Sequence, residues 1–589
     1  MSRIATVVCP ILSAALLLAS GPALAQEPVE EAARQAVSTA FTLATDQPRT
    51  PEQLAVTFDK ADLSIRVIPD DRAIDAVAVL DFTAMAPVER LVVELDTILT
   101  ISAVSVDEVV IPAGGWSNPE GRLTVDLGRT LQPGQTAQLR IAYAGKPRVA
   151  PRAPWSGGFV WSTAPSGEPW IATAVQGEGC DLFWPCIDHP LAEPARVDLH
   201  ITVPPGLSAP SNGRFLGKTD DADGWTTWNW SAASPNTYAI ALNVGSYAEM
   251  TAPYASRFGN SIPMTYWYLK SDDPADVQRL FAEFAPLLDF FEATIGPYPF
   301  GDEKMGVVET PHLGMEHQTI NAYGNGYKLD GRSFDWLLQH EFSHEWFGNQ
   351  LTNTNADDMW LHEGLGSYMQ PLYEYWLNGD RYLQHSLAEQ RRGLANRFPI
   401  VTGTLRTEEQ VYNGDIGPGG DIYTKGSLIA HSLRMLIGDE AFFGAVRRLV
   451  YGRPDPRPGN FKPRFASTED FLSIVNQETG QDLTWFFRAY LYQAALPDLR
   501  QTRDGDTLKL EWVTGDGGAF PMPLEIEVNG RRQTVAMAAN RAEVQLTPGA
   551  HVLVDPDNKV LRRLAFIETW QADRAARAAR AGVEPKPDA

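Results

Sequence analysis

Apolar and polar residues alternate along residues 54–247, and clusters of Gly and Pro separate the runs. Ala76–Phe82, Leu139–Tyr143 and Val197–Pro204 are runs of this kind. Because side chains of a strand point to opposite faces in turn, this pattern is typical of half-buried strands. It predicts a β-rich domain, to which we assign residues 26–250.

After about Ala252 the apolar residues recur at helical spacing instead. Residues 275–294 place seven large apolar side chains on one helical face, which predicts a long amphipathic helix. Further helices are predicted at Ser333–Gly348, Glu363–Trp376, Asp380–Ala395, Gly426–Ile437, Thr468–Thr479 and Leu483–Leu491. Residues 251–495 are therefore expected to form a mostly helical domain.

Strand patterns return from about Leu496. Asn529-Gly530 separates two short apolar runs, and this dipeptide is a strong signal for a tight hairpin turn. We expect a small β-sandwich over residues 496–567 and, over residues 568–589, a short helix followed by a poorly ordered end. The predicted strands are Thr507–Val513, Leu524–Val528, Arg531–Met537, Glu543–Leu546 and His551–Val554.

Composition agrees with a large globular chain. Of the 589 residues, 44% are hydrophobic and 21% are charged, which argues against disorder and allows several domains. The net charge of −24 repels nucleic acid and anionic lipid, so neither is an expected partner. A solvated acidic surface explains this charge most simply; a mild preference for cationic substrates is the alternative.

The N-terminus has the pattern of a secretory signal peptide. Arg3 precedes the apolar run Ile4–Ala19, and Ala23-Leu24-Ala25 has the small-x-small form of a cleavage site. We expect residues 1–25 to be removed and the protein to be periplasmic or secreted. A membrane anchor is the alternative, but the run is shorter than the roughly 20 residues that a span needs. No later stretch is long and apolar enough to span.

Export would leave two cysteines, Cys180 and Cys186, in an oxidising compartment. They lie six residues apart, and spacing alone does not establish disulfide geometry. A disulfide and two buried thiols both remain open.

The strongest chemical signal is His340-Glu341-Phe342-Ser343-His344. On the predicted helix, residues four apart project from one face, so His340 and His344 can occupy two corners of a tetrahedral zinc. Glu341 is displaced around the helix and can act as the general base on a zinc-bound water. The simpler alternative is a helix with two incidental histidines.

A third ligand strengthens the case for a metal. Eighteen residues separate His344 from Glu363, which is room for the first helix to end and a second one to bring its carboxylate back. Two histidines and one glutamate leave the fourth position open, as a catalytic zinc site requires. His362 is a rival ligand, but on a helix it would point elsewhere. One Zn²⁺ per chain is predicted.

These residues resemble the gluzincin aminopeptidases, the family of aminopeptidase N. The likeness rests on the HExxH motif, the gap to Glu363, and the sequences Trp346-Phe347-Gly348-Asn349 and Trp360-Leu361-x-Glu363-Gly364. It implies a multidomain α+β fold: a β-rich N-terminal saddle domain, a thermolysin-like, mostly helical catalytic domain and a small C-terminal β-sandwich. The large C-terminal helical domain of many members has no counterpart here, so we expect a more open cleft.

Gly314-Met315-Glu316 is similar to the exopeptidase motif of that family. The resemblance implies that this segment seats the substrate and that Glu316 binds its free α-amino group. Leu313 and His317 stand where the family usually has Gly and Asn, which leaves the seating of the substrate backbone open.

Two further resemblances complete the predicted site. Gln176-Gly177-Glu178 is similar to a cleft motif of the family, which implies that Gln176 and Glu178 reach the substrate and that Glu178 shares the ammonium with Glu316. A polar turn is the alternative. Tyr423 corresponds to the tyrosine that donates a hydrogen bond to the oxyanion, and Tyr412 is a competing choice.

Together these features predict a zinc aminopeptidase that removes the N-terminal residue from peptides with a free N-terminus. It would act as a monomer or a small homo-oligomer. Three alternatives remain open: an epoxide hydrolase with the same zinc site, an endopeptidase, and a non-catalytic protein that keeps the fold. The preferred N-terminal residue cannot be predicted.

Overall fold

The computed structural model describes residues 37–329 and 331–581. The predicted signal peptide lies outside the described residues. The described residues from Ser38 onwards form one compact unit, and the predicted domain boundaries within it stay predictions.

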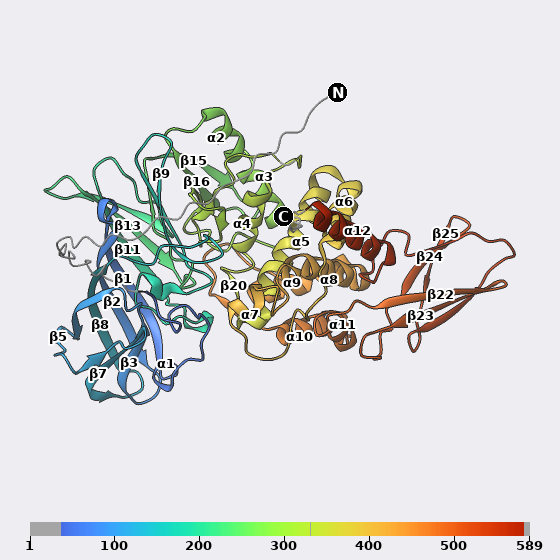
Figure 1. The fold of residues 1–589 in the computed structure, drawn as a ribbon, viewed down its shortest axis with the longest axis horizontal. Coiled ribbons are helices and arrows are strands. Elements are labelled where there is room, and N and C mark those ends of the chain that lie inside the picture. The colour runs from blue at the N-terminus through green and yellow to red at the C-terminus, as the bar shows by residue number, and fades with distance from the viewer. Residues whose placement is uncertain (1–36, 330, 582–589) are drawn as a thin grey trace, which may run out of the picture. The chain divides into compact units, whose positions relative to one another are not determined.

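The β-rich N-terminal part is built on an eight-stranded sheet (Figure 1). Neighbouring strands are antiparallel except for β1 and β11, which run parallel. The predicted strands at residues 76–82 and 139–143 lie in β2 and β8, and the one at 197–204 lies in β11 up to Val203, so the alternating pattern was a reliable guide. The sheet order is β12 (Arg214–Asp220), β13 (Thr226–Ala233), β11 (Arg196–Val203), β1 (Val56–Ile68), β2 (Ala73–Ala84), β8 (Thr136–Gly145), β4 (Thr100–Val106) and β5 (Val109–Val110).

Two three-stranded sheets complete this part. One has the order β3 (Val88–Glu94), β7 (Arg122–Leu131) and β6 (Trp116–Ser117), and the other β14 (Asn243–Val244), β10 (Pro169–Ala174) and β9 (Gly158–Thr163). The segment with Gln176 and Glu178 directly follows β10.

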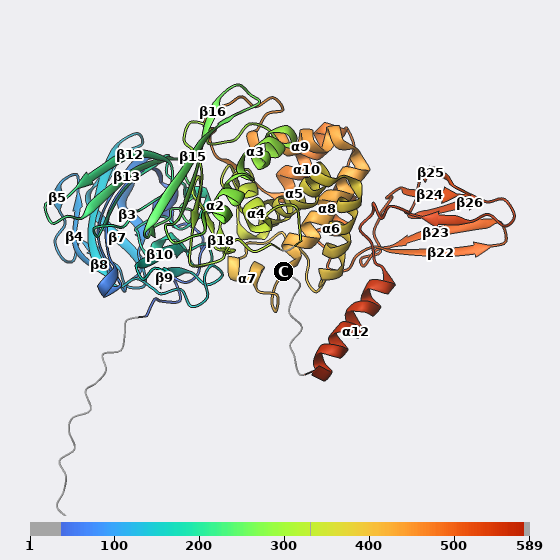
Figure 2. The same cartoon turned by 90° about the horizontal axis from the view of Figure 1, so that it is seen from above.

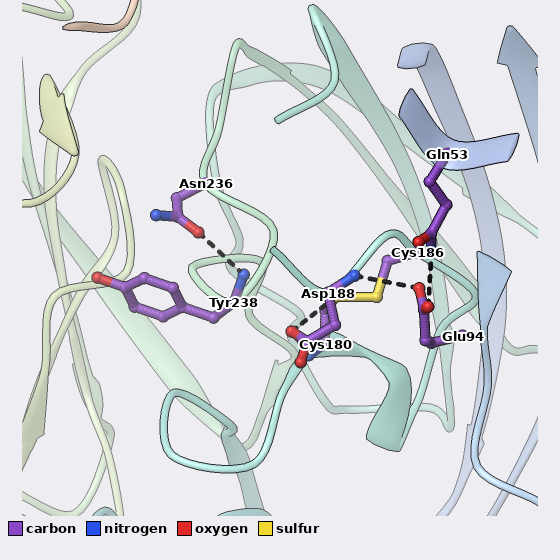
Figure 3. Close-up of a disulfide and its surroundings, with 7 residues drawn as sticks. All are labelled: Gln53, Glu94, Cys180, Cys186, Asp188, Asn236 and Tyr238. Atoms are coloured by element: carbon purple, nitrogen blue, oxygen red, sulfur yellow. Dashed lines mark hydrogen bonds between the residues drawn. A yellow bond between two sulfur atoms is a disulfide. The ribbon is translucent and has the colours of Figure 1, made fainter. Parts of the chain in front are cut away.

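A disulfide joins Cys180 to Cys186, which decides between the two alternatives left open by the sequence (Figure 3). The backbone of Cys186 exchanges two hydrogen bonds with that of Glu94 at the end of β3. The bridge therefore fixes the loop after Gln176 and Glu178 to the β-rich core.

A five-stranded sheet crosses the predicted boundary at residue 250. Its order is β15 (Tyr247–Ala255), β16 (Ser261–Leu269), β17 (Met305–Glu309), β19 (Asn321–Tyr323) and β18 (Gly314–Met315). The expectation of helix immediately after Ala252 was therefore wrong. Residues 261–269 are rich in aromatic and β-branched side chains, which favour strands, and their N-terminal half alternates between exposed and buried positions.

The helical part follows, and it bears out the predicted helices with one break. Residues 275–294 form two helices, α2 (Pro274–Phe281) and α3 (Phe284–Thr294). Pro286 explains the break, because its ring clashes with the carbonyl of Ala282 and it has no N–H to donate. The remaining helices are α4 (Trp336–His344), α5 (Trp360–Asn378), α6 (Asp380–Gly393), α7 (Glu408–Tyr412), α8 (Asp421–Ile437), α9 (Asp439–Tyr451), α10 (Thr468–Thr479) and α11 (Thr484–Tyr490).

The C-terminal part contains two three-stranded sheets, β22–β23–β26 and β25–β24–β27 (Figure 2). Asn529 and Gly530 both have positive φ, at 49° and 81°, as a tight hairpin turn between β24 and β25 requires. The strands are β22 (Asp498–Asp504), β23 (Thr507–Val513), β24 (Leu524–Val528), β25 (Arg531–Val535), β26 (Arg541–Gln545) and β27 (Val552–Val554). Helix α12 (Ala565–Ala581) ends the described chain.

None of the helices in the described ranges has the length and apolar character needed to cross a membrane.

Candidate active site

The two histidines of the HExxH motif lie one turn apart on α4. Their Nε2 atoms are 3.2 Å apart. The Nδ1 of His344 lies 2.8 Å from the carbonyl oxygen of Phe347. Because a carbonyl only accepts, this Nδ1 carries the hydrogen and the Nε2 lone pair is free to bind a metal.

Glu363, in the first turn of α5, brings the third ligand atom. Its Oε2 lies 3.4 Å from His344 Nε2 and 3.7 Å from His340 Nε2. This oxygen is buried and has no hydrogen-bond partner. A tetrahedral metal with bonds of about 2.05 Å would separate its ligands by about 3.3 Å. The three atoms therefore fit a shared metal ion, and the unpartnered oxygen faces the two histidines.

Two glycines bring α5 and α8 into close contact. A Cβ built on Gly364 would lie 2.9 Å from the Cα of Gly426, and one built on Gly426 would lie 2.7 Å from the Cα of Gly364. Only glycine allows the two backbones to approach this closely. The contact places Tyr423, one turn before Gly426, beside Glu363.

Both candidate tyrosines reach the same carboxylate oxygen. The hydroxyl of Tyr423 donates to Glu363 Oε1 at 3.0 Å, and that of Tyr412 donates to it at 2.8 Å. Burial and the charge of Glu363 raise the pKa of both phenols well above its ordinary value, so they remain donors. Tyr423 lies on α8, which starts five residues earlier than predicted.

Glu341 faces Gly314, the first residue of β18. A Cβ on Gly314 would overlap Glu341 Oε1 and lie 3.0 Å from its Cδ, so this position requires glycine for space. Glu341 is 5% exposed, and its Oε2 has no partner. Burial, with the charges of Glu316 and Glu363, raises the pKa of Glu341 well above the usual carboxyl value, as is typical of catalytic groups.

Glu316 lies next to Glu341, and residues far upstream hold it in place. Its Oε1 accepts hydrogen bonds from Gln176 Nε2 at 2.9 Å and from the Tyr238 hydroxyl at 2.8 Å. Asn349 donates to its backbone carbonyl at 3.1 Å. Ligand atoms of Glu316, Glu341 and His344 lie within 4.8 Å of one another. Tyr238 was not predicted, because no motif in the sequence marks it.

The carboxylate of Glu178 is bound by residues of the β-rich part of the chain. Its carboxylate accepts hydrogen bonds from the backbone of Gly157 and, at 2.9 Å, from the Ser156 hydroxyl, and it pairs with Arg148 at 3.4 Å. Both oxygens are thus engaged away from Glu316, and a role for Glu178 in binding the substrate stays a prediction.

The structure also defines the contacts of His362, the rival ligand, and of His317 and Leu313, the two departures from the family motif. His362 Nε2 accepts a hydrogen bond from the backbone N–H of Asn353 at 3.0 Å, so this nitrogen is already engaged. The ring of His317 is fully buried against that of His312, and burial lowers the pKa of His317 to about 3. Leu313, half-buried, accepts a backbone hydrogen bond from Gly324.

Comparison with known proteins agrees with this geometry. Residues 297–490 match the family described as the peptidase family M1 domain. The probable aminopeptidase 2 of Sulfurisphaera tokodaii is 22% identical over 496 residues, 78% of this chain and 58% of that protein. Aminopeptidase B of Mus musculus is 28% identical over 330 residues, 53% of this chain and 46% of that protein. The chain thus spans about half the length of these relatives.

Solved structures show the same fold. An M1 zinc metallopeptidase mutant from Deinococcus radiodurans, bound to a Tyr-Ser-Ala substrate, has a TM-score of 0.64 at 24% identity. A two-domain M1 zinc metallopeptidase mutant bound to L-tryptophan has a TM-score of 0.65 at 25% identity. Both matches cover 77% of this chain and 98% of the other. The fold, the ligand geometry and the family comparison agree, and residues 297–490 of this chain are similar to the peptidase family M1 domain.

Proposed function

We propose that this protein is a zinc-dependent aminopeptidase that removes the N-terminal residue from peptides. The observation that carries the proposal is the convergence of His340 Nε2, His344 Nε2 and the unpartnered Glu363 Oε2, with Glu341 and Glu316 beside them. The names of the relatives, aminopeptidases and M1 zinc metallopeptidases, support it.

The donor set suits zinc, which binds imidazole nitrogens and carboxylate oxygens in tetrahedral sites. When bound, zinc would supply a Lewis acid that polarises the substrate carbonyl and promotes the ionisation of water.

In this proposal Glu341 takes a proton from the attacking water and later delivers it to the leaving amine. Glu341 is suited to both steps, because its carboxylate lies beside the ligand atoms and its Oε2 has no hydrogen-bond partner. Tyr423 donates a hydrogen bond to the oxygen that becomes negative, and its phenol is neutral and close to the ligands.

Glu316 would select for a free N-terminus. Its Oε1 is held by Gln176 and Tyr238, which leaves Oε2 for the substrate ammonium. An internal peptide bond offers no charge at this position, so the carboxylate favours the terminal residue.

The proposal is tested with Glu341→Gln. This variant keeps the size of the side chain but removes the base, and we expect kcat to fall by about 10²–10⁴-fold. Bound zinc should stay at one ion per chain, because Glu341 is not a ligand. Wild-type turnover in this variant would contradict the assignment.

A second assay tests the exopeptidase role. Peptides with free and acetylated N-termini are compared on the wild-type protein. We expect acetylation to abolish cleavage, and equal rates for the two peptides would indicate an endopeptidase instead.

We also propose that residues 1–25 direct export and are then removed. The support is the sequence pattern of a charged start, an apolar run and a small-residue cleavage site. Mass spectrometry of the protein from a periplasmic fraction should give Gln26 as the N-terminus, and a retained apolar segment would indicate an anchor.

A further inference from the structure

The two oxygens of Glu363 have different surroundings. Oε2 faces the histidine nitrogens and has no hydrogen-bond partner, whereas Oε1 accepts hydrogen bonds from Tyr412 and Tyr423. A carboxylate held in this way presents one chosen oxygen to a metal, because rotation would break two hydrogen bonds. Partners of this kind set the orientation of a metal ligand.

The two phenols are not equivalent. This step rests on the proposed function, in which Tyr423 turns its hydroxyl towards the oxygen of the substrate. Tyr423 would then release Glu363, and Tyr412 alone would keep Oε1 satisfied. A buried acceptor left without any donor is unfavourable, so a second donor that does not move is needed.

Tyr412 is also in contact with the residue that supports Glu316. Gln176 Nε2 donates to Glu316 Oε1 at 2.9 Å and lies 3.5 Å from the Tyr412 hydroxyl oxygen. These groups form a hydrogen-bonded chain with one direction: the Gln176 amide donates to Tyr412, and Tyr412 donates to Glu363. Each hydrogen bond in such a row polarises the next.

We propose that Tyr412 is a positioning residue for the metal ligand Glu363. It holds Oε1 throughout the reaction while Tyr423 serves the substrate, and with Gln176 it connects the ammonium-binding carboxylate to the metal-binding one. No role in contact with the reacting atoms is assigned to it.

The experiment measures zinc affinity, not activity. The full-length protein is titrated with zinc against a chromophoric chelator, as the wild type and as Tyr412→Phe, which removes only the hydroxyl. We expect the zinc dissociation constant to rise at least about 10-fold, within the range known for partners of metal ligands.

Tyr368→Phe is the matched control. Tyr368 lies on α5, the helix of Glu363, and is fully buried, and its hydroxyl lies within hydrogen-bonding distance of His431 and Arg434 instead of Glu363. Removing the Tyr368 hydroxyl should leave the zinc dissociation constant within about 2-fold of the wild-type value. Loss of a hydrogen-bond partner of a metal ligand has a larger effect than this. Equal weakening in both variants would indicate general loosening and would overturn the proposal.

The double variant Tyr412→Phe/Tyr423→Phe sharpens the result. Each single variant leaves one donor on Oε1, and the double variant leaves none. The fold-increase in the zinc dissociation constant of the double variant should therefore exceed the product of the fold-increases of the two single variants. Wild-type affinity in Tyr412→Phe would overturn the inference. If the wild type itself binds zinc no better than His340→Ala, the proposed function fails instead, and the two failures are thus distinguished.

Discussion

Replacing Gly314 by Ala tests the closest contact of the site. A single methyl group would be added beside Glu341, the proposed base. The backbone of Gly314 does not lie in the left-handed region, so alanine introduces no strain in φ and the effect comes from space alone.

The structure sets the size of the effect. The added Cβ would lie 2.6 Å from the Cδ1 of Leu337 and 3.0 Å from the Cδ of Glu341, where carbon atoms normally stay about 3.5–4.0 Å apart. Leu337 is 2% exposed and packed, so the Glu341 carboxylate has to withdraw by about 1 Å. A misplacement of this size costs about 100-fold in rate, or about 2.7 kcal/mol of transition-state stabilisation.

The assay is kcat/KM on a peptide with a free N-terminus, together with zinc content and thermal stability. We expect kcat/KM to fall about 100-fold with zinc retained, because the methyl group touches none of the three ligands. Overpacking should also lower the free energy of unfolding by about 1–3 kcal/mol.

Gly393→Ala is the control. This glycine ends α6, has open space around its Cβ position, and should accept alanine with wild-type activity. If both Gly314→Ala and Gly393→Ala keep the wild-type kcat/KM, catalysis does not depend on the observed position of Glu341, and the reasoning is refuted.

Two further predictions follow from buried groups. His317 stays neutral when folded because its pKa lies at about 3, whereas in the unfolded chain it takes up a proton below about pH 6.5, so stability falls as the pH falls from about 6.5 towards 3. The free energy of unfolding is measured by denaturant titration at pH 7 and at pH 4.5. Between these two values His317→Asn should lose about 2.5 kcal/mol less than the wild type, and identical losses would disprove this role. In Gly426→Ala, the new Cβ would meet the backbone of Gly364, so the melting temperature should fall and zinc-dependent kcat should drop, although alanine favours helix by about 1 kcal/mol at an open position. A higher melting temperature would show that α5 and α8 separate without cost.

Local patterns in the sequence predicted most of the secondary structure and the convergence of the three candidate ligands. The spacing of His340, His344 and Glu363 follows from helix geometry, and the structure brings their ligand atoms together as expected. Alternation identified β2, β8 and β11 for the same reason: burial on one face imposes a period.

Contacts between distant segments could not be predicted. Tyr238 is 78 residues from Glu316 and has no motif of its own, yet its hydroxyl holds that carboxylate. The close contact between Gly364 and Gly426 depends on how α5 and α8 pack together. From the sequence alone, a glycine within a helical segment indicates only a residue that lowers helix stability. Pro286 could have predicted the break between α2 and α3, but the strong helical period of apolar residues across 275–294 favoured one continuous helix.

The support of Glu316 by Gln176 and Tyr238 has a consequence for how the protein can change over evolution. The matched peptidase segment, residues 297–490, contains the three candidate metal ligands and Glu316 but neither of these two donors. Substitutions in the β-rich part can therefore change how firmly Glu316 is held while the candidate ligands and Glu341 keep their own sequence. The groups that orient Glu316 are thus encoded outside the stretch of the gene that encodes Glu316 itself, and selection can change one stretch without changing the other.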